Sequence, residues 1–164
     1  MSKLIKIYTD GSSIGNPGPG GYGIVMLSED GEYKKEFSQG FKITTNNRME
    51  LLAVIVGLEN LKLINCNVKI YTDSKYVSDA VEKGWLFDWV KKDFKNKKNP
   101  DLWRRFLKIY KNHKVKFQWI KGHNNNFYNE RCDFLANLAA KNLNLLEDKG
   151  CLLYTSPSPR DNTG

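Results

Sequence analysis

The sequence predicts an α/β fold in which helices pack on the faces of a mixed β-sheet. Two observations indicate this: three strand-like segments come first with no helix between them, and later strand-like segments alternate with helix-like ones. The size agrees, because 164 residues with 40% hydrophobic and 27% charged side chains are enough for one globular domain with a buried core.

Five short segments have the apolar runs or the alternation of polar and apolar residues that is typical of β-strands. The first of them alternates until it reaches Asp10. Residues 11–21 are rich in Gly, Ser and Pro, and we expect them to form a loop. The expected strands are residues 3–10, 22–27, 33–43, 68–72 and 115–120.

Longer segments between and after these strands have the features of helices. Residues 44–47 offer capping side chains, and the helix that follows is apolar almost all round, so we expect it to be central. Residues 85–99 are basic and aromatic and should contain a short helix and a loop. The remaining helices are expected at residues 49–58, 74–82, 100–110 and 129–142.

We expect residues 1–150 to form the domain, with a basic protrusion at about residues 84–100. Residues 151–164 lack periodicity, and residues 151–161 resemble one reading frame of a sequencing adapter, so we interpret them as an artefactual tail or a natural disordered one. No apolar run reaches the roughly 18 residues of a membrane span, and no signal peptide is evident. Three scattered cysteines form no C-x-x-C pair, which favours a cytoplasmic protein without a zinc site.

Positive charge is concentrated in one part of the chain. The net charge is +8, yet residues 91–116 hold 11 Lys and Arg against two Asp, a surplus of nine, so the rest sums to −1. A near-neutral body with one basic projection indicates a polyanionic partner, of which nucleic acid is the commonest. The alternative is a solvated, lysine-rich segment that keeps the protein soluble.

Four acidic residues could meet at one edge of the sheet. Asp10 and Asp73 each end a strand, and parallel neighbours would bring both to the carboxyl edge, where α/β sheets place their sites. Glu50 lies in the first turn of the central helix, and Asp133 lies early in the last one. Taken singly, each acid also has a purely structural interpretation. The two strand-end aspartates could cap turns, and Glu50 could form a capping box with residue 45 or 47. Asp133 could interact favourably with the dipole of the last helix.

Together, four acids at one edge favour a metal site. They would repel one another and raise their own pKa values unless a cation neutralised them. Ligands that are all oxygen suit Mg²⁺ or Mn²⁺ better than zinc. Two such ions about 3.5–4 Å apart can stabilise both the attacking and the leaving oxygen of a phosphoryl displacement. With a basic arm for phosphates, this predicts nuclease chemistry.

Seven short motifs occur in order along the chain. They are YTDGS at residues 8–12, GNPGPGGYG at 15–23, TTNNRME at 44–50, YTDS at 71–74, DLW at 101–103, KGH at 121–123 and NERCD at 129–133. By these motifs, residues 3–150 resemble the bacterial-type members of the type 1 ribonuclease H family. Each motif is a weak signal alone, and the ordered set is highly specific.

The resemblance implies a ribonuclease H-like fold, with a five-stranded mixed sheet flanked by helices on both faces. It implies an endonuclease that hydrolyses the RNA strand of RNA–DNA hybrids and leaves 5′-phosphate and 3′-hydroxyl ends. Two Mg²⁺ ions, or Mn²⁺ in their place, would be bridged by Asp10, with Glu50 and Asp73 on one ion and Asp133 on the other. His123 would assist proton transfer or product release, although a lone loop histidine is otherwise simply solvated.

The resemblance also implies substrate contacts on two strands. Four residues would touch the RNA strand near its 2′-hydroxyls: Gly11, Ser12, Ser13 and Asn16. Three would hold the DNA strand: Thr45, Asn46 and Asn47. On the protrusion, the expected contacts with DNA are Trp85, Lys91, Lys92 and Lys95. Reading a 2′-hydroxyl on one strand only is how a hybrid is told from a pure duplex.

Two departures from the family pattern affect these contacts. Lys75 stands where Gln is usual and adds charge beside the hybrid, and the protrusion is several residues shorter than usual around residues 96–100. Residues 18–23 match G-x-G-x-x-G, but a strand is expected after them, which excludes a dinucleotide site. We expect these glycines to allow close approach of a nucleic-acid strand.

Three other kinds of protein could share features of this sequence. A strand-transferring integrase or transposase core uses fewer acids and separate DNA-binding domains, and a catalytically inactive binding domain would not need all four acids. The domain also occurs at the end of reverse transcriptases. Met1, close before the first strand, favours a free-standing protein, which we expect to be a monomer that binds RNA–DNA hybrid and no membrane.

Overall fold

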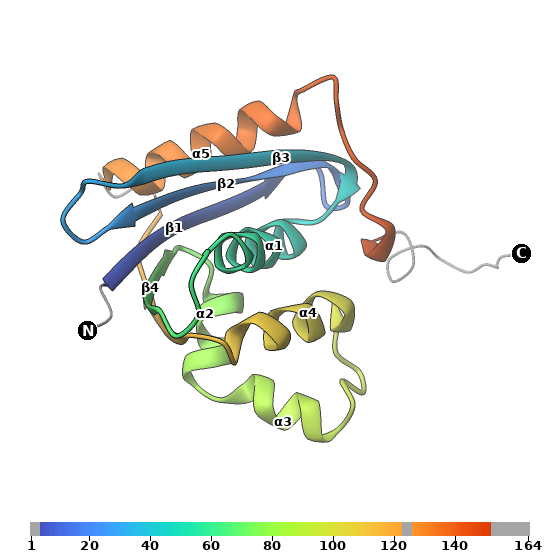
Figure 1. Cartoon of the computed structure of the whole chain (residues 1–164). Helices are drawn as coiled ribbons and strands as arrows, with labels where there is room; N and C mark the ends of the chain where they lie inside the picture. The colour runs from blue at the N-terminus through green and yellow to red at the C-terminus, as the bar shows by residue number, and fades with distance from the viewer. Residues whose placement is uncertain (1–3, 123–125, 152–164) are drawn as a thin grey trace, which may run out of the picture.

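The computed structural model describes residues 4–122 and 126–151, and a five-stranded sheet organises it (Figure 1). The strands lie in the order β3-β2-β1-β4-β5. β1 pairs antiparallel with β2 and parallel with β4, β2 pairs antiparallel with β3, and β4 pairs parallel with β5. Their bounds are β1 Leu4–Ser13, β2 Gly18–Ser28, β3 Lys34–Thr44, β4 Asn67–Thr72 and β5 Lys114–Trp119.

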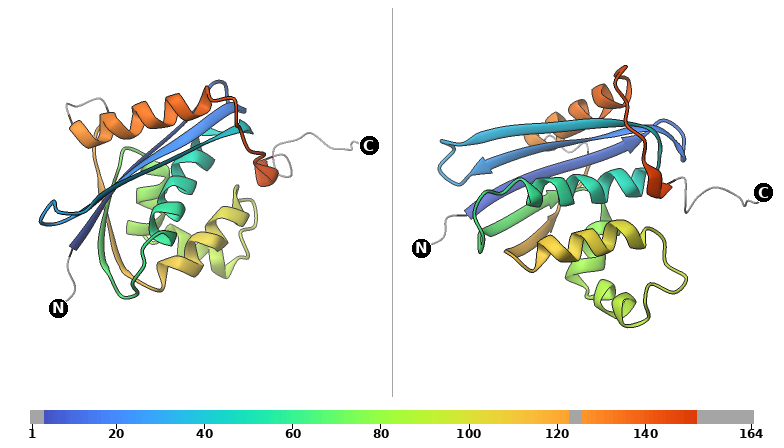
Figure 2. Two further views of the ribbon diagram at one scale, coloured as in Figure 1. Left: turned by 45° about the horizontal axis from the view of Figure 1, so that its top comes forward. Right: turned by 45° about the vertical axis from the view of Figure 1, so that its right-hand side comes forward.

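Helices cover both faces of this mixed sheet, as predicted (Figures 1 and 2). On one face α1 packs against β1 and β2, with α2, α3 and α4 beyond it, and the main core lies between them. On the other face α5 packs against β1, β2 and β3. The helix bounds are α1 Asn46–Glu59, α2 Lys75–Glu82, α3 Trp85–Lys91, α4 Pro100–Tyr110 and α5 Phe127–Ala140.

The glycine-rich segment differs from its prediction as a loop. β1 continues to Ser13 and β2 begins at Gly18, so most of residues 11–21 lie in the sheet. α5 lies so close to β2 that a Cβ at Gly21 would stand 2.7 Å from the carbonyl oxygen of Ala136, and one at Gly23 would meet the backbone of Cys132. These two glycines therefore serve helix packing within the protein, not the approach of a nucleic-acid strand as we expected.

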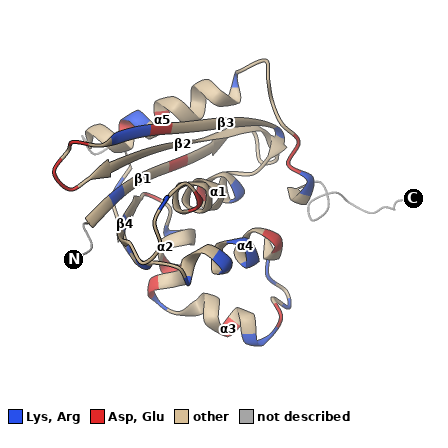
Figure 3. Ribbon diagram, in the orientation of Figure 1, with Lys and Arg blue, Asp and Glu red and all other residues tan. Residues whose placement is uncertain are grey.

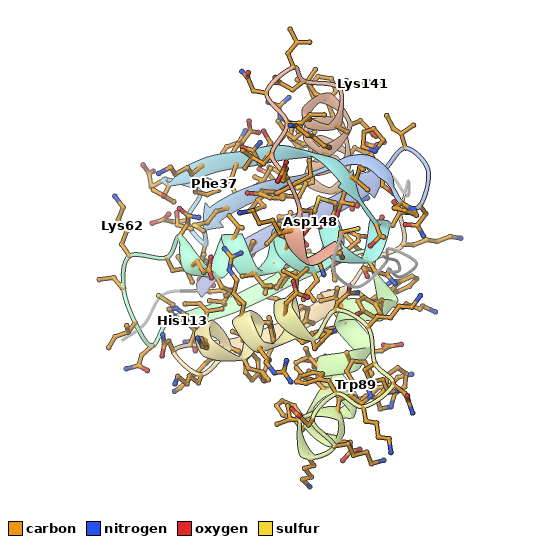
Figure 4. The ribbon with its side chains drawn as sticks, turned by 90° about the vertical axis from the view of Figure 1, so that its right-hand side faces the viewer. Phe37, Lys62, Trp89, His113, Lys141 and Asp148 are labelled. Carbon is orange, nitrogen blue, oxygen red and sulfur yellow. The ribbon has the colours of Figure 1, made fainter. Side chains whose placement is uncertain are left out.

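A buried arginine ties the start of α1 to α4 and to the end of the described chain. Arg48 is 1% exposed, and its guanidinium donates to both carboxylate oxygens of Asp101 and of Asp148, at 2.7–2.9 Å. Thr44 Oγ1 donates to Asp148 at 2.7 Å, and Figure 4 labels Asp148 where the last described segment meets α1. Of the tail expected from residue 151, only Cys151 is described, and it is buried.

Within residues 4–122 and 126–151, no helix is both long and apolar enough to cross a membrane. Cys66 and Cys132 are free thiols.

Removing Asp148 is expected to destabilise the fold strongly. Asp148→Ala leaves the buried Arg48 charge with Asp101 as its one carboxylate partner among the described residues, and breaking such a buried pair costs about 3–5 kcal/mol. Urea unfolding measures this loss. The matched control is Glu59→Ala, which breaks the half-exposed Arg105–Glu59 pair at 2.6 Å and should cost less than about 1 kcal/mol. Equal losses in the two variants would contradict the role of the Arg48 network.

Candidate active site

Three predicted carboxylates converge at the carboxyl edge of the parallel strands. Asp10 lies on β1, Asp73 directly follows β4, and Glu50 reaches them from the second turn of α1. One carboxylate oxygen from each lies within 4.8 Å of the other two. The parallel pairing of β1 with β4 causes this convergence, because both strands end at the same edge.

Glu50 is directed into the cluster by the close packing of α1 on β1. A Cβ at Gly11 would collide with the backbone of Met49 and Glu50, so only glycine lets the helix lie there. The Gly11 N–H donates to Glu50 Oε1 at 2.8 Å. The capping box proposed for Glu50 is absent from α1: Thr45 is the N-cap and accepts from the N–H of Arg48.

Asp73 is held by Trp119, which the sequence motifs did not single out, and it lies beside Gly122 of the KGH motif. The indole Nε1–H of Trp119 donates to the Asp73 carbonyl oxygen at 3.0 Å. A Cβ at Gly122 would lie 2.7 Å from Asp73 Oδ2, so the start of the following loop touches this carboxylate. Trp119 pairs in register with Thr72, beside Asp73, and this pairing between distant strands has no local signal in the sequence. His123 lies outside the described residues.

Asp133 approaches the cluster from the opposite face of the sheet. It is half-buried on α5, and its charge contributes to raising the pKa of Asp10, although its oxygens lie outside the 4.8 Å group. Asn137, one turn later, donates from Nδ2 to the Asp133 carbonyl oxygen at 3.0 Å and accepts from Ser12 Oγ at 3.2 Å. The end of β1 thereby fixes the turn of α5 that carries Asp133.

The cluster disfavours its own negative charge. Burial, followed by the charge of Asp73, raises the pKa of Asp10 to about 8. Burial, followed by the charges of Asp10 and Asp73, raises the pKa of Glu50 well above its ordinary value. A divalent cation would relieve this repulsion, and a donor set made only of carboxylate oxygens fits a hard ion such as Mg²⁺.

Hydrogen bonds join residues expected to touch RNA to one at the start of α1 that is expected to touch DNA. Asn46 Oδ1 accepts from the N–H of Ser13 at 2.7 Å and from Ser13 Oγ at 3.1 Å. The N–H of Asn46 donates to Asn16 Oδ1 at 3.0 Å. Asn47 is exposed beside them, whereas the side chain of Thr45 is engaged as the helix cap.

The protrusion consists of α3 and the loop that leads to α4, and Figure 3 shows basic residues along it. Trp85 is 46% exposed, whereas Phe94 is buried and the half-buried Trp89 packs on Trp103. A groove of about 450 Å³ there is lined by Trp85, Asp88, Trp89, Lys92, Lys95 and Lys97. Lys91 is exposed as well.

The basic segment is not one projection, which corrects our interpretation of its charge. α4 runs back to the sheet, so Lys114 and Lys116 lie on β5, away from the protrusion. Lys75 also lies apart from the protrusion, at the start of α2, with its ammonium 4.7 Å from the centre of the Trp119 ring. The charge of residues 91–116 is thus divided between two surfaces.

The raised pKa of Asp10 makes the stability of the metal-free protein depend on pH. Between its ordinary value of 3.8 and about 8, the folded state holds a proton that the unfolded state has released, so stability falls as pH rises through this range. In EDTA, Asp10→Asn should therefore have a higher Tm than wild type at about pH 8, and this difference in Tm should become smaller toward about pH 4. The control Asp79→Asn, on α2, should lack this rise. A Tm difference between Asp10→Asn and wild type that does not change with pH would contradict burial and charge repulsion as the cause of the raised pKa.

Known proteins share this sequence and geometry. The RNase H family model matches residues 2–141. A ribonuclease H of Desulforamulus reducens is 58% identical over 148 residues, which cover 87% of this chain and 91% of that protein. A ribonuclease H of Trichodesmium erythraeum is 54% identical over 151 residues, which cover 89% and 94%.

Solved structures agree. LC9-RNase H1, a type 1 RNase H with the type 2 active-site motif, matches with a TM-score of 0.77 and 30% identity, over 85% of this chain and 73% of that one. LC11-RNase H1 in complex with an RNA/DNA hybrid matches with a TM-score of 0.64 and 32% identity, over 83% and 96%. The chain belongs to the ribonuclease H family.

Proposed function

We propose that this protein is an endonuclease that hydrolyses the RNA strand of RNA–DNA hybrids, leaving 5′-phosphate and 3′-hydroxyl ends. The observation that carries the proposal is the partly buried cluster of Asp10, Glu50 and Asp73, in which one carboxylate oxygen from each residue lies within 4.8 Å of the other two. Family membership supports it, and LC11-RNase H1 has been solved with such a hybrid.

Four carboxylates would hold two Mg²⁺ ions, or Mn²⁺ in their place. Asp10 would bridge both ions, Glu50 and Asp73 would hold one, and Asp133 would hold the other. When bound, the ions supply an activated water and stabilise charge on both sides of the scissile phosphodiester. The raised pKa values of Asp10 and Glu50 support this, because these acids need a cation in order to ionise together.

The chain itself contributes orientation and proton handling. The Gly11 N–H aims Glu50, and Trp119 fixes the backbone at Asp73, so the ligands are set before substrate arrives. His123 would move a proton at the leaving oxygen or assist release of product. Its place in the sequence supports that role, because it directly follows Gly122, the residue that lies beside Asp73.

Hybrid selection would come from the joined surface beside the cluster. Gly11, Ser12, Ser13 and Asn16 would face the 2′-hydroxyl groups of RNA, and Thr45, Asn46 and Asn47 would hold the DNA strand. The hydrogen bonds that link Asn46 to Ser13 and Asn16 support this, because they fix one set relative to the other. The protrusion would grip the DNA strand through Trp85, Lys91, Lys92 and Lys95, and Lys75 would add charge beside the hybrid.

We also propose a cytoplasmic monomer. Free thiols suit a reducing compartment, and one chain alone supplies all four proposed carboxylates.

Asp10→Asn should abolish cleavage while binding to the hybrid survives in Ca²⁺. The assay uses one labelled RNA strand, paired with DNA, paired with RNA or left single, each with Mg²⁺ or EDTA. Wild type should cut only the hybrid, and only with Mg²⁺, whereas the control Asp79→Asn should cut like wild type. Normal turnover by Asp10→Asn would refute the metal role of this carboxylate.

Charge reversal on the protrusion should weaken binding and leave chemistry largely intact. Changing Lys91, Lys92, Lys95 and Lys97 to Glu should raise KM at moderate salt with little change in kcat. If four phosphate contacts are lost, the salt dependence of log affinity should become shallower by about 3.6. Reversal of Lys35, Lys42, Lys62 and Lys141 changes the net charge equally and should raise KM less. An equal fall in kcat and rise in KM would mean that the protrusion shapes the active site instead.

A further inference from the structure

One pentapeptide occurs twice in this chain, on neighbouring strands. Lys-Ile-Tyr-Thr-Asp stands at residues 6–10 on β1 and again at residues 69–73 on β4 and its end. The two strands are parallel and in register, with Lys6 beside Lys69 and Tyr8 beside Tyr71. The same side chains therefore lie next to one another, in the order lysine, tyrosine, aspartate, along the direction that leads to the carboxylate cluster.

These lysines and tyrosines share the face of the sheet that α5 partly covers. Ile7 and Ile70, between them in the sequence, are fully buried in the core on the α1 side, so their neighbours point the other way. The rings of Tyr8 and Tyr71 are stacked, with centroids 4.4 Å apart and planes 9° apart, as expected of side chains on one face. β5 extends the lysine row, because Lys116 pairs with Lys69.

The part of this face on β4 and β5 is open. α5 packs against β1, β2 and β3, and on β5 the exposed Lys114, Lys116 and Gln118 alternate with buried residues. A groove of about 1080 Å³ lies at the amino ends of β1, β4 and β5, and Lys69, Lys114 and Lys116 of this face form part of its lining. Its charged lining is Glu29, Lys69, Lys111, Lys114 and Lys116, with His113 beside them.

The lysine row has no carboxylate partner in the described part of the chain. No ion pair within 4.0 Å joins Lys6, Lys69, Lys114 or Lys116 to an acid there. Adjacent strands lie about 4.8 Å apart, and like charges placed side by side across strands are destabilising. A row of this kind is favourable when a polyanion binds it. Lys69 lies over the Tyr71 ring at 5.5 Å, so charge and aromatic surface are contiguous.

We propose that this open face, defined by Lys6, Lys69, Lys114, Lys116 and Tyr71, binds a single-stranded extension of the RNA strand whose hybrid part occupies the carboxylate cluster. The lysines contact its phosphates, and Tyr71 offers a ring on which a base stacks. This rests on the proposed function, because the extension is part of the substrate of that reaction.

Three observations select this occupant. The face is continuous with the cluster, since Lys69 precedes Asp73 by four residues, about 13 Å along an extended strand. The strand cut at the cluster is RNA, whereas the expected DNA contacts lie at the start of α1 and on the protrusion. A half-buried tyrosine between the lysines and the acids suits a base, and an acidic peptide would have no use for it.

The test compares hybrids that share one duplex and differ only at their ends. One is blunt, one carries an oligouridine tail on the 5′ or 3′ end of RNA, and one carries an oligothymidine tail on DNA. Dissociation constants are measured in Ca²⁺, and cleavage in Mg²⁺. For wild type, an RNA tail of one polarity should tighten binding. That gain should fall about 18-fold between 50 and 200 mM salt, as expected for three phosphate contacts at about −0.7 each.

The variant that tests the face is Lys69→Gln with Lys116→Gln. Within this variant, the ratio of the blunt to the tailed dissociation constant should lose most of its wild-type size, because two of the lysines that contact the tail are gone. The control, Lys62→Gln with Lys141→Gln, removes the same charge from two other sites (Figure 4) and should keep the wild-type ratio. Thermal unfolding of both variants reports on the fold.

The outcomes separate this proposal from the proposed function. An RNA tail that adds no affinity in wild type, or a gain that survives in Lys69→Gln with Lys116→Gln, overturns the proposal even when the blunt hybrid is cut normally. An equal, lysine-dependent gain from the DNA tail overturns the assignment to RNA. Stronger lysine-dependent binding of a polyglutamate peptide than of the tail would assign the face to an acidic protein segment instead. If wild type does not cleave the blunt hybrid in Mg²⁺, the proposed function itself is refuted.

Discussion

The close approach of α1 to β1 is the constraint on which the site depends. At Gly11 the two backbones lie so close that no residue with a Cβ fits, and this contact places Glu50 beside Asp10 and Asp73. Burial, with the charges of the neighbouring acids, raises the pKa values of Asp10 and Glu50, so ionising these carboxylates together carries a penalty in the free energy of the folded state. The apolar core beneath the sheet offsets that penalty, and a cation would remove it.

The same turn of α1 balances a second group of charges. Arg48 and Glu50 are two residues apart and therefore point in different directions from the helix, toward two acid clusters of opposite character. Arg48 neutralises Asp101 and Asp148, and despite its partial burial the pKa of Asp101 is lowered by its bonds to that guanidinium. Glu50 instead joins acids that lack a cation. One cluster anchors the helix, and the other is available for chemistry.

Much of this arrangement could be predicted from the sequence, because periodicity and strand-end aspartates depend on local order. The strands, the helices and the convergence of Asp10 with Asp73 follow from them. What could not be predicted depends on packing between distant segments. Gly21 and Gly23 suggested close approach of a nucleic-acid strand because nothing local reveals that α5 lies on them, and Trp119 gained its role only from the register of β5. The basic segment was likewise divided by the return of α4.

The two surfaces that this division creates differ in how their charge is compensated. On the protrusion, Asp93 pairs with Arg104 at 2.8 Å, and Asp88 lines the groove with the lysines. In the groove at the amino ends of β1, β4 and β5, Glu29 is the one acidic residue in the described lining, against four lysines. Because α5 stops short of these strands, their lysines stay in water, where unpaired charge is tolerated until an anion arrives. The coverage of the sheet by α5 thus decides where this chain can hold a polyanion beyond its carboxylate edge.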